Sequence, residues 1–383
     1  MFLFLHNTGD AASVDTVGRE FVFAYPTPYY PTSSYTSYLP VLYLVIQNQG
    51  VDEGTTTVKI INGERLTVLG TENVGVGALV NITIPFRSYF GNDFTRNIED
   101  PKTIKITATI DVSVHAFYSY NQRYSTWLIA GTVILPTSAL GTKYFVASYQ
   151  PTIGYYSEFT VTSLDEATNV EVRGRDGFRQ ELALEPHQTF QYRSKIDLTG
   201  SEITADKPIS VVSGVSASKV PINKDYNSYL VSHLPAADGL GRNYLLAPFK
   251  DRSSGYIYRV VGTKDNTNMI ISGSTHPIEL HAGEMLDRDL PGDNITSIEA
   301  TQPILVYQLS KGYAMENSIG NAAMVVVPGI DMFSSGVMFP VTVMPTASDR
   351  ISYSLSITIR CEASQGLLLD GVALGEYRTM KHV

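Results

Sequence analysis

The chain has 383 residues with 28 basic and 37 acidic side chains, which gives a formal net charge of −9. An acidic chain without a basic block does not fit a nucleic-acid or anionic-membrane surface, so we expect no nucleic acid among its partners. Hydrophobic residues make up 43% and charged residues 17%, which is typical of a folded protein and excludes a disordered tail. This length has room for about two to four modules.

Cys361 is the only cysteine, so neither an intrachain disulfide nor a cysteine-based metal site can form. The first residues, Met1 to Leu5, are apolar but lack the basic region and the length of a secretory signal. If the natural product is exported, we expect this sequence to be a fragment without its signal. No stretch reaches the roughly 20 apolar residues that a membrane helix needs, so we expect no membrane insertion.

The first predicted strand, residues 19–25, leads into a loop rich in proline and tyrosine, Pro26–Tyr38. Tyrosine supplies a large contact area at a small entropic cost, so this segment is a candidate recognition surface. Packing over the end of a sheet is the alternative, and it is the commoner fate of aromatic side chains. The candidate ligand-binding residues here are Tyr25, Tyr29, Tyr30, Tyr35 and Tyr38.

A polar turn followed by an alternating β-branched run recurs along the chain, as a strand with one buried face does. The copies are Ile106–Val114, Ser201–Val212 and Ser297–Val306, which are displaced by 97 and then 95 residues. Pro208 and Pro303 occupy equivalent places, where an edge or a strand entrance tolerates the missing N–H. The chain therefore contains internal repeats.

A unit of about 95 residues with six or seven short predicted strands is typical of a β-sandwich module. We therefore predict an all-β fold of tandem β-sandwich-like repeats. The alternative is a β-propeller with two blades per unit, which requires a similarity between half-units. The predicted domains are an N-terminal segment 1–17, β repeats 18–134, 135–233 and 234–326, and a partial fourth repeat 327–383.

A second candidate binding loop is Ser216–Tyr229, because it is longer than a connection between strands requires. Its candidate contact residues are Tyr226 and Tyr229. Asn81 and Asn294 each begin an Asn-Ile-Thr sequence, which is the acceptor pattern for N-glycosylation.

The sequence offers little that indicates catalysis or metal binding. His276, Glu279 and His281 are close in sequence, but on a strand the first faces away from the other two, so they do not converge as metal ligands. Gly214-Val-Ser216 lacks the closing glycine of a nucleophile elbow. No phosphate-binding or dinucleotide-binding motif is present. We expect no catalytic residues, no metal and no cofactor.

Five motifs occur in an order that resembles the N-terminal domain of the IgGFc-binding protein family. The resemblance covers residues from about Gly18 to Gly371. It is carried by Gly18–Phe23, by Leu135-Pro136 with the glycine and tyrosines that follow, and by Leu198–Gly214, Leu230–Pro235 and Ala323–Pro328.

The resemblance implies a secreted protein associated with mucus or a cell surface, in which this domain stands at the front of a larger mosaic that often contains von Willebrand D modules. It implies no catalytic residues. The chain departs from the vertebrate pattern at Asn227, where a cysteine is expected. Immunoglobulin binding is therefore not carried over, because such affinity resides in a few side chains.

Together these observations predict a non-enzymatic, secreted, extracellular interaction or scaffold module. Its expected partner is an extracellular glycoprotein or mucin-like protein, or another copy of the assembly by self-association. Three alternatives remain. A carbohydrate-active enzyme requires a carboxylate pair in an aromatic-lined cleft. A structural spacer requires no ligand, and an intracellular scaffold fits the cysteine count alone.

Overall fold

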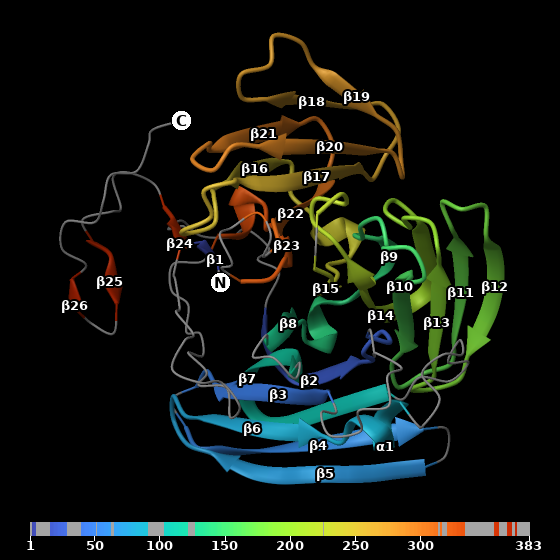
Figure 1. Cartoon of the computed structure of the whole chain (residues 1–383). Coiled ribbons are helices and arrows are strands. Elements are labelled where there is room, and N and C mark those ends of the chain that lie inside the picture. Colours follow the sequence, from blue (N-terminus) through green and yellow to red (C-terminus); the bar gives the residue numbers. More distant parts are fainter. Residues whose placement is uncertain are drawn as a thin grey trace.

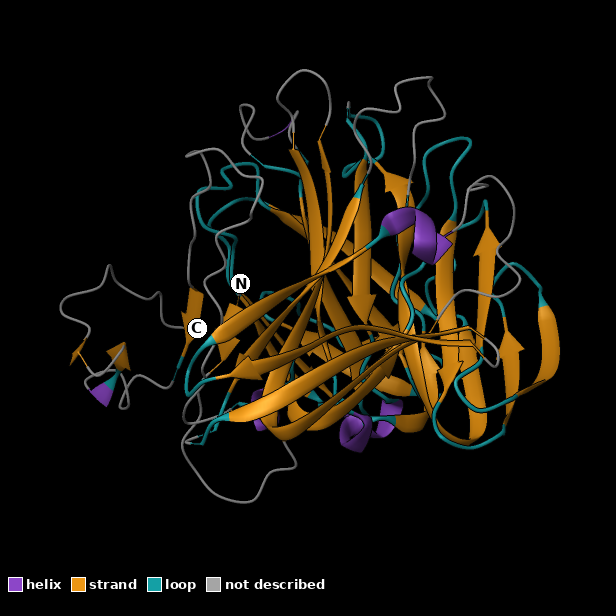
Figure 2. Cartoon of the chain, turned by 90° about the horizontal axis from the view of Figure 1, so that it is seen from below, coloured by secondary structure: helices purple, strands orange, loops and turns teal. Residues whose placement is uncertain are grey.

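The computed structural model describes residues 2–4, 16–28, 40–50, 52–62, 65–90, 103–121, 127–224, 226–312, 315, 320–333, 356–359, 366–369 and 372–373. Strands make up nearly all of its regular structure, which confirms the predicted all-β class (Figures 1 and 2). Among these residues no helix has the length and apolar character to span a bilayer.

Repeat 1, at the bottom of Figure 1, is built around one 19-residue strand, β7. Strands β4, β2, β3 and β8 all pair with β7 antiparallel, while β5 pairs with β4 and β6 with β3. The elements are β2 (Val17–Phe23), β3 (Val41–Asn48), β4 (Gly54–Asn62), β5 (Arg65–Val74), β6 (Leu79–Ile84), α1 (Phe86–Phe90), β7 (Thr103–Asn121) and β8 (Trp127–Ile134).

Repeat 2, at the right of Figure 1, has the same pairing order. The 17-residue strand β14 pairs with β11, β9, β10 and β15, while β12 pairs with β11 and β13 with β10. The elements are η1 (Thr137–Ala139), β9 (Gly141–Phe145), β10 (Ser157–Ser163), β11 (Thr168–Arg173), β12 (Arg179–Leu184), β13 (Thr189–Ser194), β14 (Glu202–Ser218) and β15 (Ser228–His233).

Repeat 3, at the top of Figure 1, keeps this order but divides the long strand into β21 and β22. Two separate four-stranded sheets result, β16-β21-β18-β19 and β20-β17-β22-β23. The elements are η2 (Ala237–Gly239), β16 (Asn243–Leu246), β17 (Tyr256–Gly262), β18 (Thr267–Ile271), β19 (Ile278–Leu280), β20 (Met285–Leu290), β21 (Thr296–Ala300), β22 (Ile304–Ser310) and β23 (Met324–Val326).

The remaining described elements are short. Strand β1 pairs in parallel with β24, and β25 and β26 form a hairpin. Their bounds are β1 (Phe2–Phe4), η4 (Ile330–Met332), β24 (Ser356–Thr358), β25 (Leu368–Leu369) and β26 (Val372–Ala373).

The recurring isoleucine marks the same structural position in all three repeats. Ile106, Ile203 and Ile298 are each fully buried in the long strand. Each pairs with the first strand of its repeat on one side and with the third strand on the other. A buried position with neighbours on both sides favours a β-branched apolar side chain.

The two prolines lie where the long strand changes partners. β14 runs on through Pro208, so this proline does not mark a strand entrance as the sequence predicted. The β9 register shifts between Thr204 and Ile209, and the pairing with β10 begins at Ile209. Pro303 lies in the gap between β21 and β22. A residue without an N–H is tolerated at such a break because no ladder bond is lost.

The cores do not stop at the predicted domain boundaries. The core of repeat 1 contains Val212, Tyr229 and Val231 from repeat 2. The core of repeat 2 contains Ile257, Tyr307 and further residues from repeat 3. Because side chains cross from one repeat into the next, the boundaries at 134, 233 and 326 stay predictions.

Candidate interaction loops

Two of the tyrosines predicted to bind a ligand are core residues. Tyr25 and Tyr229 each have 2% exposure. Tyr25 lies edge-on to Phe23 and Tyr89, with ring centroids 5.5 and 5.9 Å away. Tyr229 lies 5.1 Å from the ring of Tyr118. Burial raises the pKa of both hydroxyls well above the usual value. This corrects the prediction for these two residues, because a buried ring cannot contact a partner.

The hydroxyl of Tyr229 joins the bases of the two predicted loops. It donates a hydrogen bond of 3.0 Å to the carbonyl oxygen of Pro26, where the tyrosine-rich segment begins. Thr160 donates a second bond of 3.0 Å to the carbonyl of Ala24. The base of that segment is therefore fixed to repeat 2. The other four candidates, Tyr29, Tyr30, Tyr35 and Tyr38, lie outside the described residues.

The second loop is shorter than the sequence predicted, because β14 extends to Ser218 and β15 begins at Ser228. Its tip is exposed: Tyr226 has 59% and Ile222 has 47% exposure. Tyr226 has a φ of 67°, a left-handed conformation that few non-glycine residues adopt. The backbone of Val220 anchors this loop, since its carbonyl accepts a 2.7 Å bond from Gly312 N–H.

A third loop, residues 150–156, lies beside the second and was not predicted. Thr152 Oγ1 donates to Asn227 Oδ1 at 2.7 Å, and Thr152 N–H donates to the Ala217 carbonyl at 3.0 Å. The next residue, Ile153, has 99% exposure. Asn227 therefore joins the two loops. We call Ile153, Ile222 and Tyr226 the loop patch.

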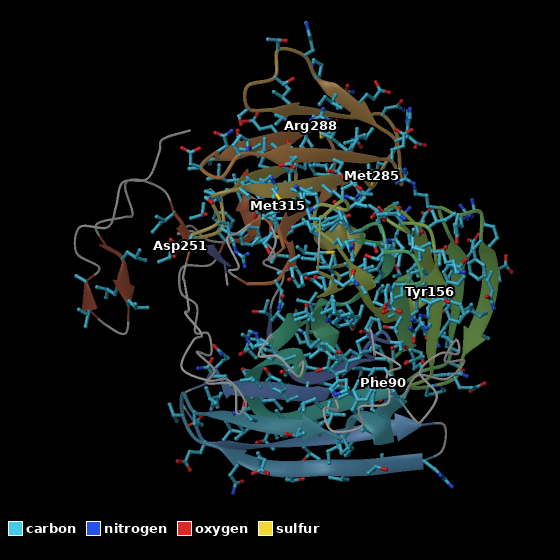
Figure 3. The ribbon with its side chains drawn as sticks, viewed as in Figure 1. Phe90, Tyr156, Asp251, Met285, Arg288 and Met315 are labelled. Atoms are coloured by element: carbon cyan, nitrogen blue, oxygen red, sulfur yellow. The ribbon has the colours of Figure 1, made fainter. Side chains whose placement is uncertain are left out.

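The loop patch stands on a rigid base in repeat 2. Figure 3 labels Tyr156, at the end of the third loop, among the strands of this repeat. The guanidinium of Arg193 lies 4.3 Å from its ring centroid, and Arg193 Nε donates to Glu158 Oε2 at 2.9 Å. Glu158 is fully buried, and burial raises the pKa of its carboxyl to about 7. Exposed apolar side chains on a fixed base can bind a partner with little loss of entropy.

Both predicted glycosylation acceptors have exposed side chains. Asn81 lies on β6, opposite Val45 of β3. Asn294 lies in the turn between β20 and β21, and its backbone carbonyl accepts a 3.0 Å bond from the Tyr256 hydroxyl. A sugar could therefore be attached at either position without disturbing the core. Their modification stays a prediction.

A polar network centred on the buried Arg259 joins repeat 2 to repeat 3, and the sequence did not indicate it. Arg259, with 3% exposure, pairs with Asp197 at 2.6 Å and with Asp287 at 2.8 Å. It also donates to the carbonyl of Ser148 at 3.1 Å and lies 4.4 Å from the ring centroid of Tyr149. Both carboxylates are paired with one guanidinium, an arrangement that stabilises structure.

The residues considered for metal binding or catalysis do not form a site. They are either exposed on the surface or already hydrogen-bonded. His281 Nε2 is 3.7 Å from Glu279 Oε1, and both side chains are half exposed. Ser216 is buried, and its hydroxyl donates to the carbonyl of Tyr156 at 3.1 Å. In the part of the chain that the structure describes, no three His, Cys, Asp or Glu side chains are grouped to hold a metal.

The chain is similar to known proteins in sequence. The family model described as IgGFc binding protein matches residues 130–383. The human IgGFc-binding protein is 24% identical over 266 residues, which is 66% of this chain. The chain spans about 5% of that protein's length.

Solved structures add no argument, because their similarity is low. Thermotoga maritima 1070 has a TM-score of 0.22 and 13% identity over 30% of this chain and 91% of its own. The major pilin of Streptococcus pyogenes has a TM-score of 0.16 and 10% identity over 74% of this chain and 96% of its own. The family match covers well over half of the sequence and includes repeats 2 and 3. The chain therefore belongs to the IgGFc-binding protein family.

Proposed function

We propose that this chain is a non-enzymatic extracellular binding module that captures a protein or glycoprotein partner through the loop patch. Family membership supports a binding role, since the human relative is named for binding the Fc part of immunoglobulin G. The observation that carries the proposal is the full exposure of Ile153 beside a loop that presents Tyr226 and Ile222. Large apolar side chains exposed together are typical of interaction sites.

The chemistry of the patch favours a partner with an apolar or sugar-bearing surface. An aliphatic side chain and a tyrosine ring can pack against either, and the tyrosine hydroxyl adds a polar contact. Secretion, a mucus or matrix setting and a mucin-like partner belong to this proposal. The four tyrosines of segment 29–38 belong to it too, because the base of that segment lies against Tyr229.

The test is capture by the immobilised chain from mucus or extracellular extract, with purified immunoglobulin G in a separate lane. Ile153→Ser combined with Tyr226→Asn should lower capture by at least about tenfold, since central apolar contacts are worth more than about 1.4 kcal/mol. Asparagine suits the left-handed conformation of position 226. Thermal stability should not change, because both side chains are exposed.

The matched control is Leu66→Ser with Val68→Ser on β5, where the exposures are 55% and 52%. This pair should leave capture unchanged. Equal losses in both variants would mean nonspecific adhesion and would overturn the proposal. A third variant replaces Tyr29, Tyr30, Tyr35 and Tyr38 with alanine. A loss confined to that variant would move the site from the loop patch to the tyrosine-rich segment.

A further inference from the structure

Three segments of repeat 2 come together at one end of its sheet, because β10 lies between β13 and β14. β10 begins at Ser157 directly opposite Ser194, the last residue of β13, so Lys195 follows beside the third loop. On the other side β14 ends at Ser218, whose hydroxyl donates to the carbonyl of Gln150 at 2.6 Å. We call this region the loop end of repeat 2, and it carries the loop patch.

The loop end carries three lysines that have no carboxylate partner among the described residues. They are Lys195, Lys219 and Lys224, and we call them the lysine rim. The other lysines of repeat 2 lie away from the loop end and are paired. Lys143 on β9 pairs with Glu202 at 2.5 Å, and Lys207 pairs with Glu166 of the β10–β11 turn at 2.8 Å. Unpaired lysines are thus confined to one end of this repeat.

Two carboxyl groups in the elements that form the loop end are already bound to arginines. Glu158 is fully buried, and its Oε2 accepts from Arg193 Nε at 2.9 Å. Asp197 has 9% exposure and pairs with Arg259 at 2.6 Å. Asp225 lies outside the described residues. The lysine rim therefore places positive charge on an acidic chain, and the sequence shows no basic block because its members come from separate segments.

The corresponding end of repeat 3 differs in both charge and polarity. Lys250, in the loop before β17, pairs with Asp251, and Lys311, just after β22, pairs with Asp289 at 2.6 Å. Both lysines are neutralised within the repeat. The described residues of that loop also expose no large apolar side chain. Unpaired cations beside exposed apolar side chains therefore distinguish repeat 2 from repeat 3.

We propose that the loop end of repeat 2 binds an acidic oligosaccharide, with the lysine rim on its carboxylate or sulfate groups and the loop patch against its sugar rings. This inference rests on the function proposed above and names the chemistry of the partner. Ammonium groups donate charge-assisted hydrogen bonds to such anions. A tyrosine ring and aliphatic side chains can pack against the apolar face of a sugar.

The small size of the loop patch favours a sugar chain over a protein surface. A stable protein interface buries roughly 800 Å² on each partner. Three exposed apolar side chains, Ile153, Ile222 and Tyr226, form only a small part of such an area. A few side chains can hold an oligosaccharide, because each sugar ring offers one apolar face and several polar groups.

Binding of defined polymers to the full chain at about 0.15 M salt, where distant charges are screened, tests the proposal. The probes are polysialic acid, dextran sulfate, neutral dextran and polyglutamate. At least one of the two acidic polysaccharides should bind at least about tenfold more tightly than neutral dextran and more tightly than polyglutamate. Binding of neither acidic polysaccharide would overturn the proposal. Equally tight binding of polyglutamate would assign the anion to a protein and would also overturn it.

A triple substitution in the lysine rim tests the site. Lys195→Gln, Lys219→Gln and Lys224→Gln together should weaken polysaccharide binding by about tenfold, because each exposed ionic contact contributes modestly. The matched control removes the same charge elsewhere, through Lys59→Gln, Lys207→Gln and Lys264→Gln, and should bind as the parent chain does. Equal weakening in both variants would mean nonspecific attraction and would overturn the proposal.

Capture from extract separates this inference from the proposed function. If capture survives removal of sialic acid and sulfate from the extract and still depends on Ile153 and Tyr226, the proposed function stands and the acidic oligosaccharide is wrong. If the chain captures nothing from extract but binds an acidic polysaccharide through the lysine rim, the proposed function is contradicted and this inference stands.

Discussion

A buried tyrosine fixes the entry of the chain into repeats 2 and 3. Tyr144 accepts from Gly141 N–H at 2.9 Å and donates to the Ile209 carbonyl at 2.7 Å. Tyr244 makes the same two bonds, to Gly241 N–H and to the Ile304 carbonyl. Repeat 1 has Phe21 at this position, so these two side-chain bonds are missing there and the Phe21 ring packs in the core beside the β2–β7 pairing. The glycine-x-x-tyrosine motif in the sequence is thus a structural motif.

Tyr144→Phe should therefore lower the free energy of unfolding by about 1 to 2 kcal/mol, because a half-buried N–H and a buried carbonyl lose their partner. Denaturant unfolding measures the loss. Tyr226→Phe removes a hydroxyl from a ring that is 59% exposed, and it should change the stability little. Equal stability of Tyr144→Phe and the parent chain would contradict the role assigned to this hydroxyl.

The buried carboxyl of Glu158 should make the stability depend on pH. Burial raises the pKa of this group from 4.5 to about 7, and one of its oxygens lacks a partner among the described residues. Between these values the folded chain holds a proton that the unfolded chain releases. This contribution to stability is present below about pH 4.5 and is lost as the pH rises towards 7.

Glu158→Gln should flatten the pH dependence of the unfolding free energy in that window. The slope is the useful readout, because the substitution also removes the carboxylate that pairs with Arg193 and so changes the absolute stability. Denaturant unfolding at several pH values provides the measurement. A slope identical to that of the parent chain would mean that Glu158 does not titrate in this range.

At the scale of elements, one side chain of β17 connects two repeats. Arg259→Leu should lower the free energy of unfolding by about 3 to 5 kcal/mol, because Asp197 is left buried without a cation. Arg259→Lys should recover only part of this loss, since an ammonium group cannot reproduce the guanidinium geometry. Arg288→Leu is the control, since Arg288 is exposed on β20 (Figure 3). Calorimetry of the three variants should give the largest loss of stability for Arg259→Leu, a smaller loss for Arg259→Lys and the smallest for Arg288→Leu.

Much of the strand content could be predicted, because a polar turn before an alternating run identifies a strand with one buried face. The role of the long strand could not be predicted, since a period of two does not tell which sheet a strand joins. Pro208 shows the limit: its missing N–H suits an edge, an entrance or a change of partner equally. Only the third occurs in β14.

For the loops, too, the sequence predicted some features and missed others. The sequence indicated the second loop by its length, and Tyr226 is exposed there. It could not distinguish the exposed Tyr226 from the buried Tyr229. Tyr229 is buried because it lies in strand β15, which begins only two residues after Tyr226. Ile153 gave no signal, since an isolated isoleucine in a turn has no pattern that predicts exposure. Pairing through Thr152 and Asn227 is a long-range contact and requires the fold.

At the scale of the whole molecule, shared cores should make the repeats unfold together. Val231 of repeat 2 lies in the core of repeat 1 and has 3% exposure. Val231→Ala should therefore lower, by the same amount, the unfolding midpoint seen by Trp127 fluorescence and by far-ultraviolet circular dichroism. Trp127 is the only tryptophan and lies in β8 of repeat 1. Two separate transitions would show that the repeats are independent domains.

The polar contacts at the two junctions differ, and this difference favours one order of the repeats. Thr160 and Arg259 occupy the same position, yet one bonds a neutral backbone and the other needs the carboxylate of Asp197 from the repeat before it. If repeats 2 and 3 were exchanged, Arg259 would face Ala24 and Thr27, and its charge would lose Asp197. A duplicated segment could be inserted only where its neighbours supply matching partners. Each repeat therefore carries junction side chains whose partners are supplied by the repeat next to it.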